Sequence, residues 1–517
     1  MQKLEDDHRQ VVPRWRPFGI AAKLKVLDSV GVPTPLKPHA DEIEQLIRDW
    51  RNNRTPFHAA NLVDAAIVLD KPEIASEAAA FLSEGGRPGF IDTELARVVL
   101  GRAGNVPLPD TPPKIAPQER HKRIAAYRRS LREQPWNPIR LVDLAREYSA
   151  LGQQEPAERA LVRAVNLAPD NRFVLRSASR FLMHVGQPEE AHRILRRAPS
   201  TQRDPWLLAA ELVAADAAGR SSKWTKLAEG MIRSGSFDPR HTTELASALG
   251  TMAYNEGKRS HVRRLFTHAL IKPTENSVAQ AGWISRHMAS FEVPETNFSV
   301  PLAFEAKAWE AAFESRFKEA VDLSWEWLLD EPFATRPASF GSYMASIALE
   351  DYENARMLAE AALLANPDDP QLILQLIYCV ASQGKTDEAE RLLTHDLPNA
   401  TRRNPSDIPT AHLPVFVAAD EGLIAYRRNQ FAQGKANYER AIALARDARD
   451  PALEAAALLN LIREEVRANP SSIVPWEKAE QLLKAFPTSD RLFYEKFLER
   501  SRLGQRIAMS VRQQAHR

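Results

Sequence analysis

Apolar side chains recur at helical spacing between residues 138 and 171. They fall on one face of a first helix and on one face of a second helix, with Gly152 between the two, where a glycine permits a tight turn. This pattern predicts an antiparallel helix pair that ends at Pro169. The positions that carry the pattern are Leu141, Leu144, Tyr148, Ala157, Leu161 and Ala164.

The same pattern returns at an offset of thirty-four residues, which indicates a repeat protein. Small residues such as Ala157 and Ala164 let two antiparallel helices approach closely enough to interlock. The repeated positions are Leu175, Ala178, Leu182, Gly186, Ala191, Leu195 and Ala198.

The first unit resembles a tetratricopeptide repeat. The residues at that family's signature spacings are Leu144, Ala145, Tyr148, Ala157, Ala164 and Pro169, although Leu141 stands where the family often has an aromatic residue. The resemblance implies an all-α fold, an α-solenoid in which helix pairs form a right-handed superhelix. It further implies that first helices line a concave groove and second helices cover the convex side.

Weaker copies of the pattern cover most of residues 119–486. The prolines within residues 105–118 each remove a backbone donor and restrict the preceding residue, so this stretch is expected to be a linker. We expect about nine or ten helix pairs, some degenerate. The predicted organisation is an N-terminal helical region with a degenerate repeat at 1–104, the linker at 105–118, repeat arrays at 119–290 and 302–396, a proline-containing loop at 397–414, and C-terminal repeats with a capping helix at 415–517.

Composition narrows the classes of protein that fit. The 517 residues are too many for one ordinary compact core, and the net charge of +2 argues against a globally basic nucleic-acid binder. The single cysteine, Cys379, excludes an internal disulfide framework and a multi-cysteine zinc site. The chain begins without a secretory signal and has no apolar run of membrane-spanning length, so we expect a cytoplasmic protein without membrane insertion.

The sequence carries no recognisable motif of catalysis or of metal or nucleotide binding. Gly384, Lys385 and Thr386 resemble the end of a phosphate-binding loop, but Cys379 stands where that motif needs its first glycine. The closest histidine pair, His261 and His268, lies beside arginines that disfavour a cation site. The sequence therefore predicts no enzyme, no metal site and no cofactor.

Three arginines are predicted to face the groove in the first two clear repeats. Because guanidinium groups grip carboxylates with paired hydrogen bonds, these positions suit an acidic peptide. Members of the family that bind chaperone tails use a lysine and an asparagine where Val142 and Arg146 stand here, so that type of clamp is not expected. The predicted groove residues are Arg146, Phe173, Arg176, Arg180 and Met183.

The equivalent positions of a later pair of repeats form an apolar and aromatic wall that suits an amphipathic helix of a partner. In both grooves the alternative remains open that neighbouring repeats or the chain's own terminal helices fill the space. The predicted residues of this second groove are Phe340, Met344, Ile347, Leu374 and Tyr378.

A basic ridge is predicted on the convex side, where Arg129, Arg163 and Arg197 recur at the repeat period. Together with the Arg14-Trp15-Arg16 segment and a basic C-terminal end, the ridge could bind the phosphates of a nucleic acid. The alternative is that the ridge is a solvated surface and that Trp15 covers the open apolar end of the first helices. The leading prediction is a non-enzymatic scaffold or adaptor that binds protein partners in its concave groove, and the alternative is a nucleic-acid-associated protein.

Overall fold

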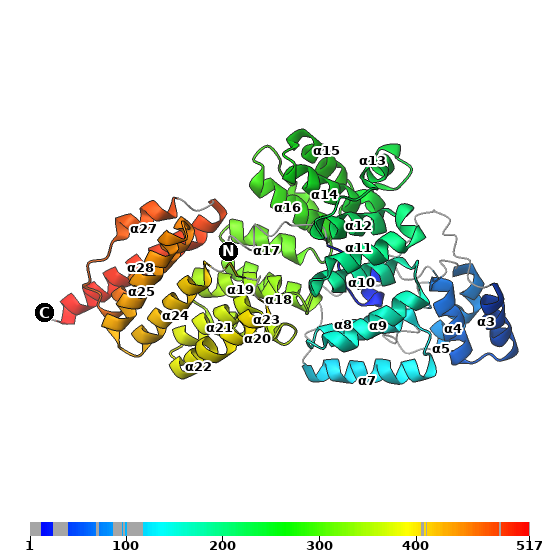
Figure 1. Ribbon diagram of the computed structural model, residues 1–517, viewed down its shortest axis with the longest axis horizontal. Coiled ribbons are helices and arrows are strands. Elements are labelled where there is room, and N and C mark those ends of the chain that lie inside the picture. Colours follow the sequence, from blue (N-terminus) through cyan, green and yellow to red (C-terminus); the bar gives the residue numbers. More distant parts are fainter. Residues whose placement is uncertain are drawn as a thin grey trace. The chain divides into compact units, whose positions relative to one another are not determined.

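The computed structural model describes residues 12–23, 40–68, 72–85, 117–404, 411–484 and 488–515, together with residues 96, 99, 100, 408 and 409. Over these residues the chain is helical and contains no β-strand (Figure 1). The predicted all-α fold is therefore confirmed. Most of the predicted linker at 105–118 lies outside the described residues, and residues 117 and 118 begin helix α7.

The chain divides into two compact units. We call the first, residues 8–306 and 329–333, the N-terminal unit, and the second, residues 307–328 and 334–517, the C-terminal unit. The short segment 329–333 thus belongs to the N-terminal unit although it follows the first helices of the other unit along the chain.

The N-terminal unit begins with short helices and continues as successive helix pairs. Its helices are α2 (Phe18–Lys23), α3 (Ala40–Asn52), α4 (Pro56–Val68), η1 (Pro72–Ala75), α5 (Ser76–Gly85), α7 (Pro117–Glu133), α8 (Pro138–Ser149), α9 (Gln154–Leu167), α10 (Arg172–His184), α11 (Pro188–Arg197), η2 (Pro199–Gln202), α12 (Pro205–Ala217), α13 (Thr225–Ser234), α14 (Pro239–Asn255), α15 (Arg259–Ala269), α16 (Glu275–His287) and η3 (Glu295–Ser299).

The C-terminal unit continues the series of pairs and ends in a long helix. Its helices, of which α17 and α18 cross the division, are α17 (Phe304–Phe313), α18 (Phe317–Asp330), α19 (Arg336–Tyr343), η4 (Met344–Leu349), α20 (Tyr352–Leu363), α21 (Pro370–Ser382), α22 (Thr386–Arg391), η5 (Leu392–Asp396), α23 (Leu397–Arg403), α24 (Leu413–Arg427), α25 (Phe431–Asp447), α26 (Pro451–Ala468), α27 (Trp476–Leu483) and α28 (Thr488–Ala515).

The two clearest predicted repeats form the pairs α8–α9 and α10–α11. Their first helices begin in the same way, because the side chains of Asn137 and Asn171 each accept a hydrogen bond from a backbone N–H in the first turn. Gly152 and Gly186 sit at the turns with φ of 68° and 71°, in the left-handed region that favours glycine. The predicted helix–turn–helix units and their turn glycines are confirmed.

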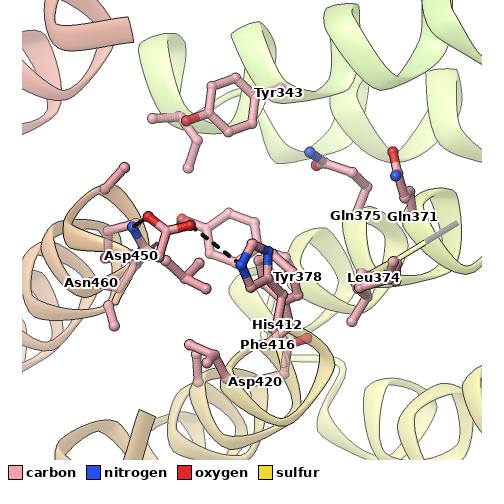
Figure 2. Close-up of a pocket in the computed structure, with 18 of the residues that line it drawn as sticks. Tyr343, Gln371, Leu374, Gln375, Tyr378, His412, Phe416, Asp420, Asp450 and Asn460 are labelled. Atoms are coloured by element: carbon pink, nitrogen blue, oxygen red, sulfur yellow. Dashed lines mark hydrogen bonds and ion pairs between the residues drawn. The ribbon is translucent and has the colours of Figure 1, made fainter. Parts of the chain in front are cut away.

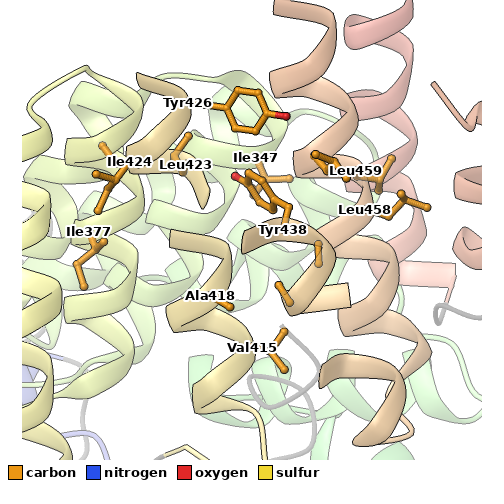
Figure 3. Close-up of a cluster of buried hydrophobic side chains, with 14 of the residues drawn as sticks. Ile347, Ile377, Val415, Ala418, Leu423, Ile424, Tyr426, Tyr438, Leu458 and Leu459 are labelled. Carbon is orange, nitrogen blue, oxygen red and sulfur yellow. The ribbon is translucent and has the colours of Figure 1, made fainter. Parts of the chain in front are cut away.

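A cluster of buried hydrophobic side chains connects η4 with the helices that follow it as far as α28, and Figure 3 shows part of this cluster. Tyr438 on α25 packs against Gly422 on α24 so closely that a Cβ on Gly422 would lie 2.8 Å from the ring. Small residues at such points allow the two helices of a pair to approach, which is the role predicted for alanines in the earlier repeats.

Part of the predicted loop at 397–414 is helical. Residues 397–403 form α23, which follows the π-helix η5 without a break, and α24 begins at Leu413. Pro398 lies just after the junction of η5 and α23, where the helical run changes from π to α geometry. Residues 397–403, expected to be part of a loop, therefore belong to a helical run that contains a proline.

Candidate functional site

The segment 12–18 packs within the N-terminal unit, against the first helices that were predicted to line a groove. Trp15 is completely buried, with its ring 6.1 Å from that of Phe181 on α10 and 5.2 Å from that of Phe333, between centroids. Phe18 packs edge-on to Phe173, one of the predicted groove residues, at 5.3 Å. Trp15 is therefore core, and it covers the middle of this helix layer.

The two arginines beside Trp15 are held by acidic side chains of the same unit. Arg16 donates from Nε and Nη2 to Asp330, at 2.7 and 2.6 Å, and from Nη1 to Glu275. Arg14 pairs with Glu305 and with Glu331. Both guanidinium groups are thereby occupied and largely buried, so the predicted docking of this segment onto nucleic acid would require it to leave the unit.

The predicted arginines on α8 and α10 bind acceptors of their own chain. Arg146 donates to the backbone carbonyls of Trp15 and Asp330, at 3.0 and 2.8 Å. Arg176 lies 2.8 Å from a carboxylate oxygen of Glu244, and Arg180 lies 3.6 Å from one of Glu331. The expected chemistry of arginine with carboxylates is present, and the carboxylates belong to the protein itself.

Asp143 fixes the end of the segment, since its Oδ1 accepts a hydrogen bond from the backbone N–H of Phe18 at 3.0 Å. Burial raises the pKa of this carboxyl from the ordinary 3.8 to about 7, against the opposing effects of the Phe18 N–H and Arg146. Between these two values the folded state binds more protons than the unfolded state, so the free energy of unfolding falls as pH rises.

Replacing Asp143 with asparagine is expected to remove this pH dependence while an amide oxygen still accepts from Phe18. Relative to wild type, the variant should gain stability between about pH 4 and pH 7, by up to about 4 kcal/mol at neutral pH. Chemical denaturation of both proteins across this range measures the difference. A difference that stays constant with pH would contradict the assignment.

The C-terminal unit contains a cavity of about 410 Å³ (Figure 2). It lies among the first helices of four successive pairs, α19, α21, α24 and α26, and residues of η4, α25, α28 and the segment before α24 also line it. The side chains that line it are Ser339, Tyr343, Ser346, Ile347, Gln371, Leu374, Gln375, Tyr378, Ile408, Pro409, His412, Val415, Phe416, Ala419, Asp420, Tyr438, Asp450, Ala452, Leu453, Ala456, Ala457, Asn460 and Tyr494.

Only some residues of the second predicted groove line this cavity. Ile347, Leu374 and Tyr378 line it. Phe340 and Met344 instead have 1% and 0% of their surface exposed, and Phe340 packs on Trp309 at 4.4 Å. The predicted residues of α21 thus line the cavity, whereas Phe340 of α19 and Met344 of η4 are buried in the core.

Two groups of polar side chains in the cavity wall are held by contacts with their neighbours. The hydroxyl of Tyr378 donates to Asn460 at 3.1 Å and accepts from Arg463, whose guanidinium also lies over the Tyr378 ring. His412 and Asp450 form an ion pair with N and O atoms 3.5 Å apart, drawn as a dashed line in Figure 2. These contacts fix the positions of the aromatic and polar groups before any ligand arrives.

Asp420 on α24 is a cavity residue that the sequence analysis did not identify. It is 7% exposed, and burial, followed by the charge of Glu421, raises its pKa well above the ordinary 3.8. The sequence could have revealed Asp420 as a single acidic residue on the otherwise apolar face of the helix formed by VFVAADEGLIAY.

The three arginines of the predicted basic ridge are exposed, on α7, α9 and α11. Arg163 donates to the carbonyl of Pro135 at 2.7 Å. At the basic C-terminal end, Arg502 pairs with Glu480 and lies over Trp476, which reduces its availability to another molecule. The side chains of Arg512 and Arg517 lie outside the described residues.

The described residues contain neither a helix that could span a membrane nor a cluster of metal ligands. None of the helices in the described ranges is long and apolar enough to cross a membrane. The same residues contain no group of three histidine, cysteine or acidic side chains placed to hold a metal ion. Cys379 is buried in α21.

The repeated helix pairs define a helical repeat protein. Residues 346–405 match the family model of the tetratricopeptide repeat, which confirms the resemblance inferred from the sequence. This match covers the end of η4 and the helices from α20 to α23, next to the cavity.

Three solved structures are among those to which the chain is similar. Yeast Tom70 is 12% identical, with 91% of this chain and 96% of that chain covered and a TM-score of 0.30. Human IFIT1, solved as a dimer with PPP-AAAA, is 14% identical over 75% of this chain and 95% of that chain, with a TM-score of 0.35. The APC/C hetero-tetramer Cut9-Hcn1 is 13% identical over 86% of each chain, with a TM-score of 0.37. The search of curated proteins found no match to the chain.

Proposed function

We propose that this protein is a scaffold that binds an amphipathic helical segment of a partner protein at the cavity of the C-terminal unit. The observation that carries the proposal is the cavity itself, which is preformed among four successive first helices and lined mainly by apolar and aromatic side chains. Its volume of about 410 Å³ falls in the range of ordinary ligand sites. The proposal assigns binding and no catalytic step.

The chain's own last helix supports the choice of an amphipathic helix as ligand. Helix α28 packs against η4 and α26, with Phe497 and Leu498 buried in the core of the unit. Arg500 of the same helix donates to the carbonyl of Ile347 at 2.7 Å. First helices of this unit thus already receive one amphipathic helix, and the cavity lies beside it, with Tyr494 of α28 in its wall.

The N-terminal unit differs from the C-terminal unit in a way that supports placing the binding site in the C-terminal unit. There the corresponding face of α8 and α10 is covered by residues 12–18 and the segment 329–333, whose charges are paired. A partner could reach Arg146 or Arg180 only by displacing these residues, whereas the cavity of the C-terminal unit requires no displacement.

Replacing Ala456 with tryptophan is expected to fill part of the cavity and to abolish partner binding, because the indole would occupy the space of the ligand. The matched control is Leu364→Trp, since Leu364 is 50% exposed and does not line the cavity. Peptides selected from a random display library on the wild-type protein provide a partner of known composition for the measurement. We expect the affinity to fall at least about tenfold in Ala456→Trp and less than about twofold in the control.

A second measurement uses natural partners, purified with the protein from its own cells before and after nuclease treatment. A protein that co-purifies in near-equal amount, resists nuclease and is lost in Ala456→Trp supports the proposal. Selected peptides or natural partners that bind Ala456→Trp as well as wild type would contradict it. Nucleic acid that disappears on digestion and leaves no protein behind would instead favour the exposed ridge.

A further inference from the structure

Asp420 differs from the other buried carboxyl groups of the protein. It forms no hydrogen bond or ion pair with another described residue, whereas each of the other buried acidic side chains in the described ranges has at least one such partner. These others are Asp143, Glu147, Asp204, Glu211, Glu244, Glu275, Glu305, Asp330, Glu331, Glu454 and Glu464.

A buried carboxyl without a partner is costly to ionise, and a protein that only needed to fill space could place an apolar residue there. Burial accordingly raises the pKa of Asp420, which favours the neutral form in the empty cavity. Because Asp420 lines the cavity, a bound cation can reach it and supply the missing partner.

The rest of the lining favours a cation over an anion. No lysine or arginine is among the residues that line the cavity in the described part of the chain, and the second carboxylate, Asp450, already pairs with His412. Tyr343 and Phe416 present aromatic rings, which attract cations by about 0.5–2 kcal/mol each when suitably placed. Arg463, which contacts the Tyr378 hydroxyl and ring, does not line the cavity and is already paired with Glu464.

We propose that Asp420 recognises the basic side chain, lysine or arginine, of the partner segment that binds in this cavity. The charged end pairs with the Asp420 carboxylate, and the aliphatic stem packs against apolar lining such as Leu374 and Ala419. This inference rests on the proposed function and makes it specific, because it states which residue of an amphipathic helix enters the cavity.

The test compares two display selections from the same random peptide library, one on the wild-type protein and one on Asp420→Asn. The substitution keeps the shape of the side chain and removes its ability to carry a negative charge. Peptides selected on wild type should share a lysine or arginine among apolar positions, and those selected on the variant should lack it. The control Glu421→Gln, which neutralises the partly exposed neighbouring acid, should select the same peptides as wild type.

One selected peptide is then made with its basic residue replaced by methionine, which retains length without charge. Asp420→Asn and the peptide change should each weaken binding about tenfold or more, and together little further, since both remove one interaction. Thermal unfolding of Asp420→Asn should match or exceed that of wild type, which excludes misfolding as the cause.

The outcomes separate this inference from the function on which it rests. Peptides that require the open cavity, by the Ala456→Trp comparison, but bind Asp420→Asn equally or tolerate methionine would overturn the role of Asp420 and leave the scaffold function standing. Peptides that bind regardless of Ala456→Trp, or a library that yields none, would overturn both.

Discussion

Replacing Arg16 with alanine is expected to destabilise the N-terminal unit by about 3–5 kcal/mol, because it leaves two buried carboxylates without their cation. Asp330 and Glu275 have side chains only 5% and 10% exposed. Burial acts to raise the pKa of Glu275, yet Arg16 holds it below the ordinary 4.5, which reflects the strength of the pairing. Chemical denaturation of wild type and variant measures the loss.

The matched control is Arg48→Ala, which breaks an exposed pair with Glu44 on α3. Such surface pairs contribute about 0–1 kcal/mol, so this variant should unfold close to wild type. If Arg16→Ala cost no more than Arg48→Ala, the segment 12–18 would not be an integral part of the unit.

Replacing Trp15 alone with alanine is expected to lower the free energy of unfolding by about 3–5 kcal/mol. The loss arises from the cavity left between Phe181 and Phe333. The indole is completely buried, and its neighbours come from α10 and from the segment 329–333, which cannot easily collapse together. The change is measured by denaturation as for Arg16.

Trp136→Ala serves as the control, since this tryptophan is 74% exposed in the same unit. It should change the stability by less than about 0.5 kcal/mol. The double variant of Trp15 and Arg16 should lose less than the sum of the two single changes, because either one loosens the same segment. Full additivity would argue that the two residues anchor the unit independently.

These two predictions concern the same structural role of residues 12–18. The segment accepts a hydrogen bond from Arg146 on α8 and places an aromatic side chain against α10, so the face predicted to line a groove is part of the core here. In the C-terminal unit, helix α28 covers part of the equivalent face and leaves the cavity beside it.

The sequence by itself determined the helices, their pairing and the family resemblance. These properties are local: the spacing of apolar residues predicts each amphipathic helix, and Gly152 and Gly186 adopt the positive φ that their turns require. The apolar stretch of residues 370–382 forms helix α21 for the same reason.

Only the tertiary structure decided which of the predicted faces stay open. Arg14 and Arg16 contact acidic residues that are about 260 to 320 positions away along the chain, and such distant contacts produce no local sequence pattern. The arginines and the acidic residues Asp330 and Glu331 can be read from the sequence, but their pairing cannot. Likewise, helical spacing placed Phe340 and Leu374 in the same predicted groove. The packing of α19 on its neighbours leaves Phe340 only 1% exposed, so this residue does not line an open groove. The isolation of Asp420 is a property of its surroundings, since a carboxyl lacks a partner only when the side chains from several helices around it fail to provide one.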